Sequence, residues 1–97
     1  MAAVADKPDL VDAFLALRKR ADVEAFLADL CTPAEIKALS ERWRVARLLD
    51  GGALSYREIA VEAGSSTATV TRVARFLKDM PYRGYRRAID LLNGVKA

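Results

Sequence analysis

Two short helix-forming segments joined at one glycine, within residues 55–77, constrain this chain more than any other feature. Ser55 and Glu58 have the spacing of a capping box, in which each side chain bonds the other residue's backbone N–H and a helix begins. This helix would end near Gly64, because glycine adopts a positive φ at little cost. A second helix is predicted from about residue 67 to 79. Two short helices joined by a tight turn are typical of a helix-turn-helix.

The apolar residues of this segment fit the close crossing of such a helix pair. Ala60 is small and lies in the middle of the first helix, where the second helix must pass closely. Val70 and Val73 are three residues apart, so they share one face of the second helix. We expect them to pack against Ile59 and Ala63 of the first helix.

The opposite face of the second helix is polar and basic, and no acidic residue lies between positions 64 and 77. Threonine hydroxyl and methyl groups can contact base edges, and arginine and lysine can contact phosphates. The first N–H groups of the helix, from Ser66 to Thr69, are expected to be free and can also bind a phosphate. The sequence therefore predicts binding to double-stranded DNA through Tyr56, Arg57, Ser66, Thr67, Ala68, Thr69, Thr71, Arg72, Arg75 and Lys78.

The charge distribution agrees with this interpretation but leaves alternatives open. Residues 56–97 carry eight Lys or Arg against four Asp or Glu, whereas residues 1–55 carry eight against nine. A basic end suits a polyanionic partner, although a solvated basic face is equally compatible with charge alone. A dimeric helical protein-interaction module is the main alternative function. A detached DNA-binding part of a transposase is another, but the chain is too short to hold the catalytic domain.

Helical spacing of apolar residues extends over most of the chain and predicts an all-α fold of about six helices. Gly51 and Gly52 would end the third helix, and Thr32, Pro33 and Glu35 form a strong signal for its start. Asp22 is the candidate N-cap of the second helix, and Trp43 and Cys31 are expected to be buried apolar residues. Besides the helix pair, the expected helices span about residues 9–20, 22–31, 32–50 and 82–92.

Several classes of function are excluded or disfavoured by composition. The chain has no histidine, so histidine acid–base chemistry and histidine metal sites are excluded, and we expect neither a metal nor a cofactor. There is no phosphate-binding glycine loop and no nucleophile–base pair, so we do not expect an enzyme. The single cysteine allows no intrachain disulfide. With no signal peptide or membrane span recognised, we expect a cytoplasmic, nucleoid-associated protein.

A set of residues spread over three stretches of the chain matches one known family: Thr32, Pro33, Glu35, Ala38, Leu39, Arg42, Trp43, Arg44, Ser55, Arg57, Glu58, Ala68, Thr69, Val70, Thr71 and Arg72. Through them, residues from about 26 to 92 resemble the Trp repressor family, and more closely its uncharacterised relatives than the tryptophan-sensing repressor. The resemblance implies an intertwined homodimer that represses transcription by placing its recognition helices in successive major grooves of a palindromic operator. It implies one domain over residues 1–97, with 9–50 for dimerisation and core, 55–79 for the helix-turn-helix and 82–93 for the last helix.

Departures from the pattern of the tryptophan sensor predict that this protein does not bind tryptophan. In the tryptophan sensor two arginines sandwich the indole, and Arg42 and Arg72 match them, as Thr32 matches another pocket residue. Val73, however, stands in place of a glycine and Phe76 in place of a small serine, while Asp29 replaces a leucine. These side chains would fill the pocket, which leaves a vestigial site of Thr32, Arg42, Arg72, Val73 and Phe76. Arg42 and Arg72 would then contact phosphate or form a surface ion pair, for which Glu41 and Asp79 are candidates. Whether any small-molecule effector exists stays open.

Overall fold

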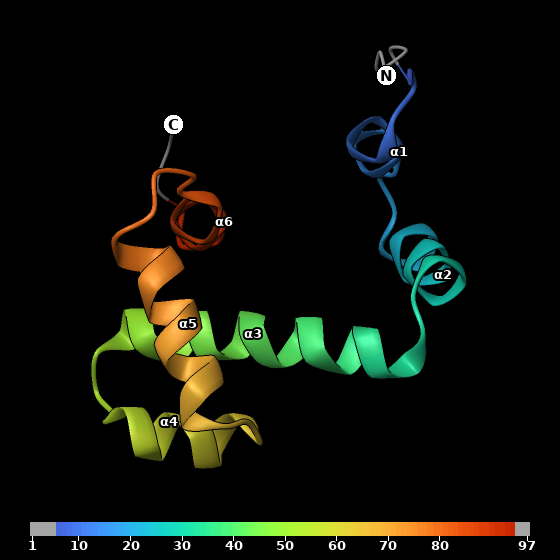
Figure 1. Cartoon of the computed structure of the whole chain (residues 1–97). Helices are drawn as coiled ribbons and strands as arrows, with labels where there is room; N and C mark the ends of the chain where they lie inside the picture. The colour runs from blue at the N-terminus through green and yellow to red at the C-terminus, as the bar shows by residue number, and fades with distance from the viewer. Residues whose placement is uncertain (1–5, 95–97) are drawn as a thin grey trace. The chain divides into compact units, whose positions relative to one another are not determined.

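A computed structural model describes residues 6–94 and has six α-helices and no strand within them (Figure 1), which confirms the predicted all-α fold. The contacts between residues divide the chain into two compact units, one up to residue 36 and one from residue 37 onward, and each is described by itself. No helix within residues 6–94 has both the length and the apolar stretch that crossing a bilayer requires. The helices are α1 (Leu10–Ala16), α2 (Arg20–Leu30), α3 (Pro33–Gly51), α4 (Tyr56–Ala63), α5 (Thr67–Lys78) and α6 (Gly84–Leu92).

The first two helices differ from their predicted bounds because the chain turns between them. Helix α1 ends at Ala16, four residues before the predicted end, and Leu17 adopts an extended backbone conformation. Helix α2 therefore starts at Arg20, and its N-cap is Lys19, which makes no side-chain capping bond, so the prediction of an Asp22 cap was wrong. The turn allows the rings of Phe14 and Phe26 to meet edge to face, with centroids 5.2 Å apart. A contact between helices has overridden the local helical preference.

Several apolar residues of the N-terminal unit are exposed. Neither α1 nor α2 has a buried residue. Leu15 is 74% exposed and Val11 is 63% exposed, and Leu30 at the end of α2 is exposed as well. Cys31 is half-buried, which corrects the expectation that it would be a buried apolar residue. The described N-terminal helices therefore do not enclose a core of their own.

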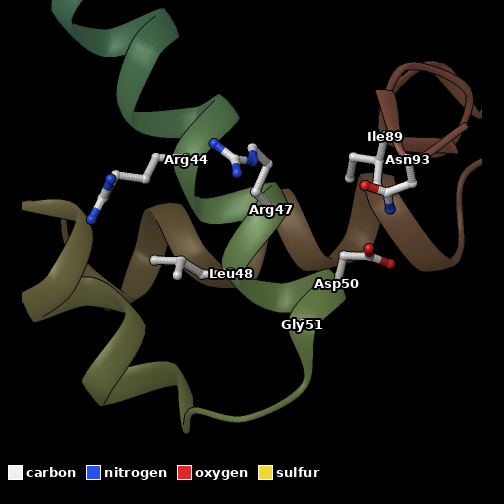
Figure 2. Close-up of a pocket in the computed structure, with 7 residues that line it drawn as sticks. All are labelled: Arg44, Arg47, Leu48, Asp50, Gly51, Ile89 and Asn93. Atoms are coloured by element: carbon white, nitrogen blue, oxygen red, sulfur yellow. The ribbon is translucent and has the colours of Figure 1, made fainter. Parts of the chain in front are cut away.

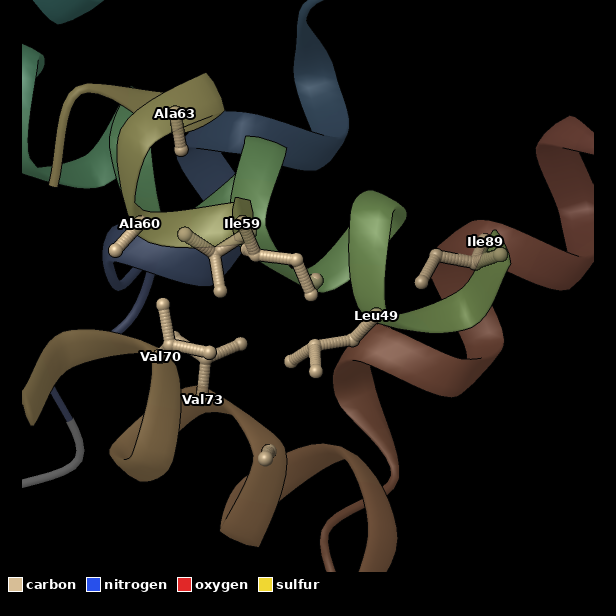
Figure 3. Close-up of a cluster of buried hydrophobic side chains, with 10 residues drawn as sticks. Leu49, Ile59, Ala60, Ala63, Val70, Val73 and Ile89 are labelled. Carbon is tan, nitrogen blue, oxygen red and sulfur yellow. The ribbon is translucent and has the colours of Figure 1, made fainter. Parts of the chain in front are cut away.

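The C-terminal unit has a compact core, to which α3, α4, α5 and α6 all contribute (Figure 3). The predicted contact of the two helix-turn-helix segments is present, since Ile59 and Val73 are each 1% exposed and Val70 is fully buried. Trp43 packs against this core and is only half-buried, rather than a core residue as expected. The core residues are Val45, Ala46, Leu49, Ile59, Ala60, Ala63, Val70, Val73, Ala74 and Ile89.

Helix α6 starts at Gly84, two residues later than predicted. The preceding residue, Arg83, has a left-handed backbone with φ 58°, so the helix cannot extend back to Tyr82. The helix ends at Leu92, as predicted, and Asn93 is its C-cap. This arrangement places α6 against α5 and completes the core beneath the helix-turn-helix.

Candidate nucleic-acid interface

The turn between α4 and α5 is built on Gly64, as the sequence predicts. Gly64 has φ 65° and ψ 37°, the left-handed conformation that glycine adopts most easily. The N–H of the next residue, Ser65, donates to the carbonyl of Ala60 over 2.8 Å, which satisfies a carbonyl at the end of α4. The chain therefore reverses within a few residues, and α5 packs directly against α4 (Figure 1).

The start of α4 is fixed by the predicted capping box. The N–H of Ser55 donates to Oε1 of Glu58 over 2.8 Å, and the N–H of Glu58 donates to Oγ of Ser55 over 3.2 Å. The backbone hydrogen bond from Ser55 holds the pKa of the Glu58 carboxyl below its ordinary value. Because both bonds stabilise the first turn, they also fix where Tyr56 and Arg57 project.

The start of α5 is capped by Ser66, which changes what this helix end can offer a phosphate. The Ser66 hydroxyl accepts from the N–H of Thr69 over 3.1 Å and donates to the Thr69 hydroxyl, also over 3.1 Å. The N–H of Thr69 is therefore not free, contrary to expectation. The N–H groups of Thr67 and Ala68 donate to no backbone carbonyl within residues 6–94, so they remain suited to an anion.

The outer face of α5 presents the predicted threonine and arginine side chains to solvent. Thr67, Ala68, Thr71, Arg72 and Arg75 are all exposed, and Thr69 is half-buried. The Thr71 hydroxyl donates to the carbonyl of Thr67 over 2.9 Å. Its proton is thus directed at the backbone, while its lone pairs and methyl group are left for a partner.

In the part of the chain that the structure describes, the cationic residues of the interface have no acidic partner. Among residues 6–94, none of Arg57, Arg72, Arg75 or Lys78 forms an ion pair. Lys78 instead lies over the ring of Tyr56, with its Nζ 6.0 Å from the ring centroid, which joins the end of α5 to the start of α4. Arginine and lysine that no carboxylate neutralises are what a phosphate backbone attracts.

The residues that match the tryptophan pocket of the family belong to both units of the chain. Val73 lies in the core between α4 and α5, and Phe76 is half-buried on α5. Thr32 belongs to the N-terminal unit, where its hydroxyl accepts from the N–H of Glu35 over 3.1 Å and caps α3. Arg42 on α3 is half-buried.

The expected ion pairs of the two matched arginines are not formed within the described part of the chain. Glu41 pairs with Lys37 one turn before it, so it is engaged elsewhere. Arg72 lies over the ring of Phe76, with its Cζ 4.5 Å from the ring centroid. The i, i+4 spacing of these two residues was a visible signal for this contact, which sequence reasoning missed.

Two grooves of the C-terminal unit were also missed, because their linings come from helices distant in sequence. The first, of about 230 Å³, lies between α3 and α6, with Arg44 and Arg47 on one side and Asn93 on the other (Figure 2). The second, of about 370 Å³, is aromatic and is lined by Trp43, Phe76, Tyr82, Gly84, Tyr85 and Ala88. No group of three potential metal ligands occurs among residues 6–94.

The capped helices α4 and α5, joined at Gly64, form a helix-turn-helix, and the family that matches this chain is one of helix-turn-helix DNA-binding regulators. The family described as Trp repressor protein matches residues 7–92. The chain therefore belongs to the Trp repressor family, as the resemblance of its sequence had implied.

Relatives of known sequence and structure agree with this assignment. The uncharacterized protein YerC of Bacillus subtilis (strain 168) is 43% identical over 81 residues, which are 84% of this chain and 76% of that protein. The crystal structure of a TrpR-like protein from Eubacterium eligens ATCC 27750 matches with a TM-score of 0.80 and 36% identity, over 91% of this chain and 89% of the other. A structure described as a candidate Trp repressor from Staphylococcus aureus matches with a TM-score of 0.79 and 39% identity, over 87% and 82% of the two chains.

Proposed function

We propose that this protein is a sequence-specific transcriptional repressor that binds a palindromic operator as a homodimer. The observation that carries the proposal is the outer face of α5, which is exposed, capped by Ser66, and free of acidic residues from position 64 to 77. Direct reading of bases would come from Thr67, Ala68, Thr71 and Arg72. The remaining predicted residues would contact the sugar–phosphate backbone of the DNA: Tyr56, Arg57, Ser66, Thr69, Arg75 and Lys78. A regulator of this kind would act at the nucleoid in the cytoplasm, and we assign it no catalytic role.

The exposed apolar face of the N-terminal helices supports the homodimer. Leu15 and Val11 are more exposed than most apolar residues of a folded protein, and burial against a second copy would remove them from water. Residues 1–36 carry seven acidic and four basic residues, whereas residues 37–97 carry six and twelve. One copy's acidic N-terminal unit is thus complementary in charge to the basic unit of another. A symmetric pair of recognition helices would demand a palindromic site.

Tryptophan is not part of the proposed mechanism. A ligand that orders the recognition helix must fill space beside it, and Val73 already fills that space as a core residue, 1% exposed. Phe76 adds a ring one turn further along α5, where it contacts Arg72. The reading helix is therefore held by the chain's own side chains, and we propose that DNA binding needs no tryptophan.

The test is to recover and sequence sheared genomic DNA bound by the purified protein, with and without L-tryptophan. The expected result is enrichment of one palindromic site in both conditions, and its loss in the double variant Thr71→Ala, Arg72→Ala. Enrichment only with tryptophan would overturn the proposed independence from tryptophan. No enrichment in either condition would overturn the operator-binding proposal and favour a protein-interaction module. A salt titration separates DNA binding from a protein-interaction module, because phosphate contacts give a steep dependence of DNA affinity on salt concentration.

A further inference from the structure

Three side chains form a continuous stack along the C-terminal part of α5. The Cζ of Arg72 lies 4.5 Å from the centroid of the Phe76 ring, within the range of a cation–π contact. The Phe76 and Tyr82 rings are nearly parallel, at 16°, with their centroids 6.4 Å apart. The stack therefore ties a proposed DNA-reading arginine to the segment that joins α5 to α6.

We propose that Phe76 is a positioning residue for DNA recognition, and that its ring holds the Arg72 guanidinium ready for the operator. This inference rests on the proposed function, in which Arg72 contacts DNA. Arg72 is exposed and makes no ion pair within residues 6–94, so the ring is the contact that restricts its side chain. An arginine that is already ordered loses less rotamer freedom when it binds.

The geometry leaves the guanidinium available to a partner. The Cζ of Arg72 lies over the Phe76 ring, and the contact needs no hydrogen bond from the guanidinium, whose N–H donors make no ion pair within residues 6–94. A carboxylate partner would have occupied those donors and reduced the charge. Phe76 therefore orders Arg72 without competing for the hydrogen bonds that a phosphate or a guanine would accept.

The ring itself is restrained by its surroundings. Phe76 is half-buried and lines the aromatic groove together with Trp43, Tyr85 and Ala88. It is not one of the core residues, so its replacement by leucine should leave the fold intact. Leucine keeps most of the apolar volume and removes the π face, whereas tryptophan keeps the π face.

The experiment compares Phe76→Leu and Phe76→Trp for affinity to the operator recovered from genomic DNA, each alone and combined with Arg72→Gln. An exposed cation–π contact corresponds to about a two- to fivefold change in affinity per helix, hence about four- to twenty-five-fold for the two helices of a dimer. Phe76→Leu should weaken binding by that factor, and Phe76→Trp should bind like the parent. In the Arg72→Gln background, Phe76→Leu should cause no further loss.

A second readout uses the free protein, in which the NMR signal of the Arg72 Nε–H should shift when the ring is removed by Phe76→Leu. Unchanged operator affinity in Phe76→Leu, a loss that persists with Arg72→Gln, or an unshifted Nε–H signal would each overturn the inference. If Arg72→Gln weakens binding and Phe76→Leu does not, this inference alone fails. If the parent protein binds no specific site, the proposed function fails and the inference fails with it.

Discussion

The guanidinium of Arg86 on α6 donates to the carboxylate of Asp50 near the end of α3, with 2.7 Å between Nη1 and Oδ1. It also donates to Asp90 one turn along α6, again over 2.7 Å from Nη2. The hydrogen bond to Asp50, together with that to Asp90, raises the pKa of Arg86 above its already high ordinary value. The ion pair of Arg86 and Asp50, which are 36 positions apart in sequence, thus joins α3 to α6. Both helices contribute to the core that also contains residues of α5.

We predict that Asp50→Asn lowers the melting temperature, because Arg86 then loses one of its two charged partners while remaining protonated. The matched control is Glu24→Gln, which breaks the ion pair of Arg20 and Glu24, whose side chains are 89% and 63% exposed. Exposed pairs of that kind contribute little to stability. Thermal unfolding followed by circular dichroism should show a clear decrease for the first variant and almost none for the second. Equal melting temperatures would contradict the structural role of Arg86.

The capping box of α4 predicts a dependence of stability on pH. The pKa of Glu58 is lowered in the folded protein, chiefly by the backbone hydrogen bond from Ser55, relative to the ordinary value of 4.5. A lowered folded pKa gives stability that is present above the unfolded pKa and lost as pH falls through the folded one. Glu58→Gln should therefore melt at a lower temperature than the parent at pH 7, and the difference should shrink below about pH 4. A difference that stays constant with pH would exclude the carboxylate as its source.

Local signals in the sequence predicted the helix-turn-helix well, because its bounds depend on neighbouring residues. Ser55, Glu58 and Gly64 each act on backbone groups within a few residues, and the structure confirms the start of α4 and the turn that they specify. The start of α2 was predicted wrongly, since the turn after Ala16 accompanies a contact between helices that no local pattern records.

The electrostatic partners of the site were less predictable than its helices. Charge alone suggested Glu41 and Asp79 as partners of the matched arginines, yet Arg72 stacks on a ring and Glu41 pairs with Lys37. Which of several nearby groups a long side chain meets depends on rotamers and on small differences in energy. The grooves are harder still to predict from the sequence, because residues such as Arg47 and Asn93 line one groove only once α3 and α6 are packed (Figure 2).

Val73 should be costly to reduce in size because its side chain on α5 is part of the core that α5 shares with α4. Val73→Ala removes two buried methyl groups and leaves a cavity, so it should lower the free energy of unfolding by about 2 to 4 kcal/mol. The control Val61→Ala makes the same change on α4 at a side chain that is 79% exposed, and its effect should stay within about 0.5 kcal/mol. Urea denaturation measures the free energy of unfolding of both variants.

The space that Val73 fills also predicts that isothermal calorimetry on the parent protein shows no tryptophan binding. Stoichiometric binding at micromolar affinity would contradict the filled site.

The proposed homodimer predicts that a charge on the apolar face of α1 weakens association. Leu15 is 74% exposed and touches no core within its own unit, so Leu15→Glu should be tolerated by the single chain and opposed by a second copy. Val61→Glu, on an exposed apolar residue of α4, is the matched control. Analytical ultracentrifugation should give a dimer for the parent and for Val61→Glu, and a marked shift toward monomer for Leu15→Glu. A parent protein that sediments as a monomer at high micromolar concentration would rule out the dimer.

The proposed role of α5 in contacting bases can be tested without disturbing the fold, because Thr71 and Arg72 are exposed. Thr71→Ala and Arg72→Ala should keep the melting temperature and the oligomeric state of the parent, yet abolish preference for the operator over unrelated DNA. Thr71→Ala leaves net charge unchanged, so its loss of preference would come from lost contacts to the operator and not from weaker attraction to phosphates. Arg87→Ala removes an exposed arginine from α6 instead, and it should leave that preference intact. Fluorescence anisotropy titrations at several salt concentrations measure the affinity for the operator and the affinity for unrelated DNA. Operator preference that survives in both α5 variants would mean that another element reads the DNA.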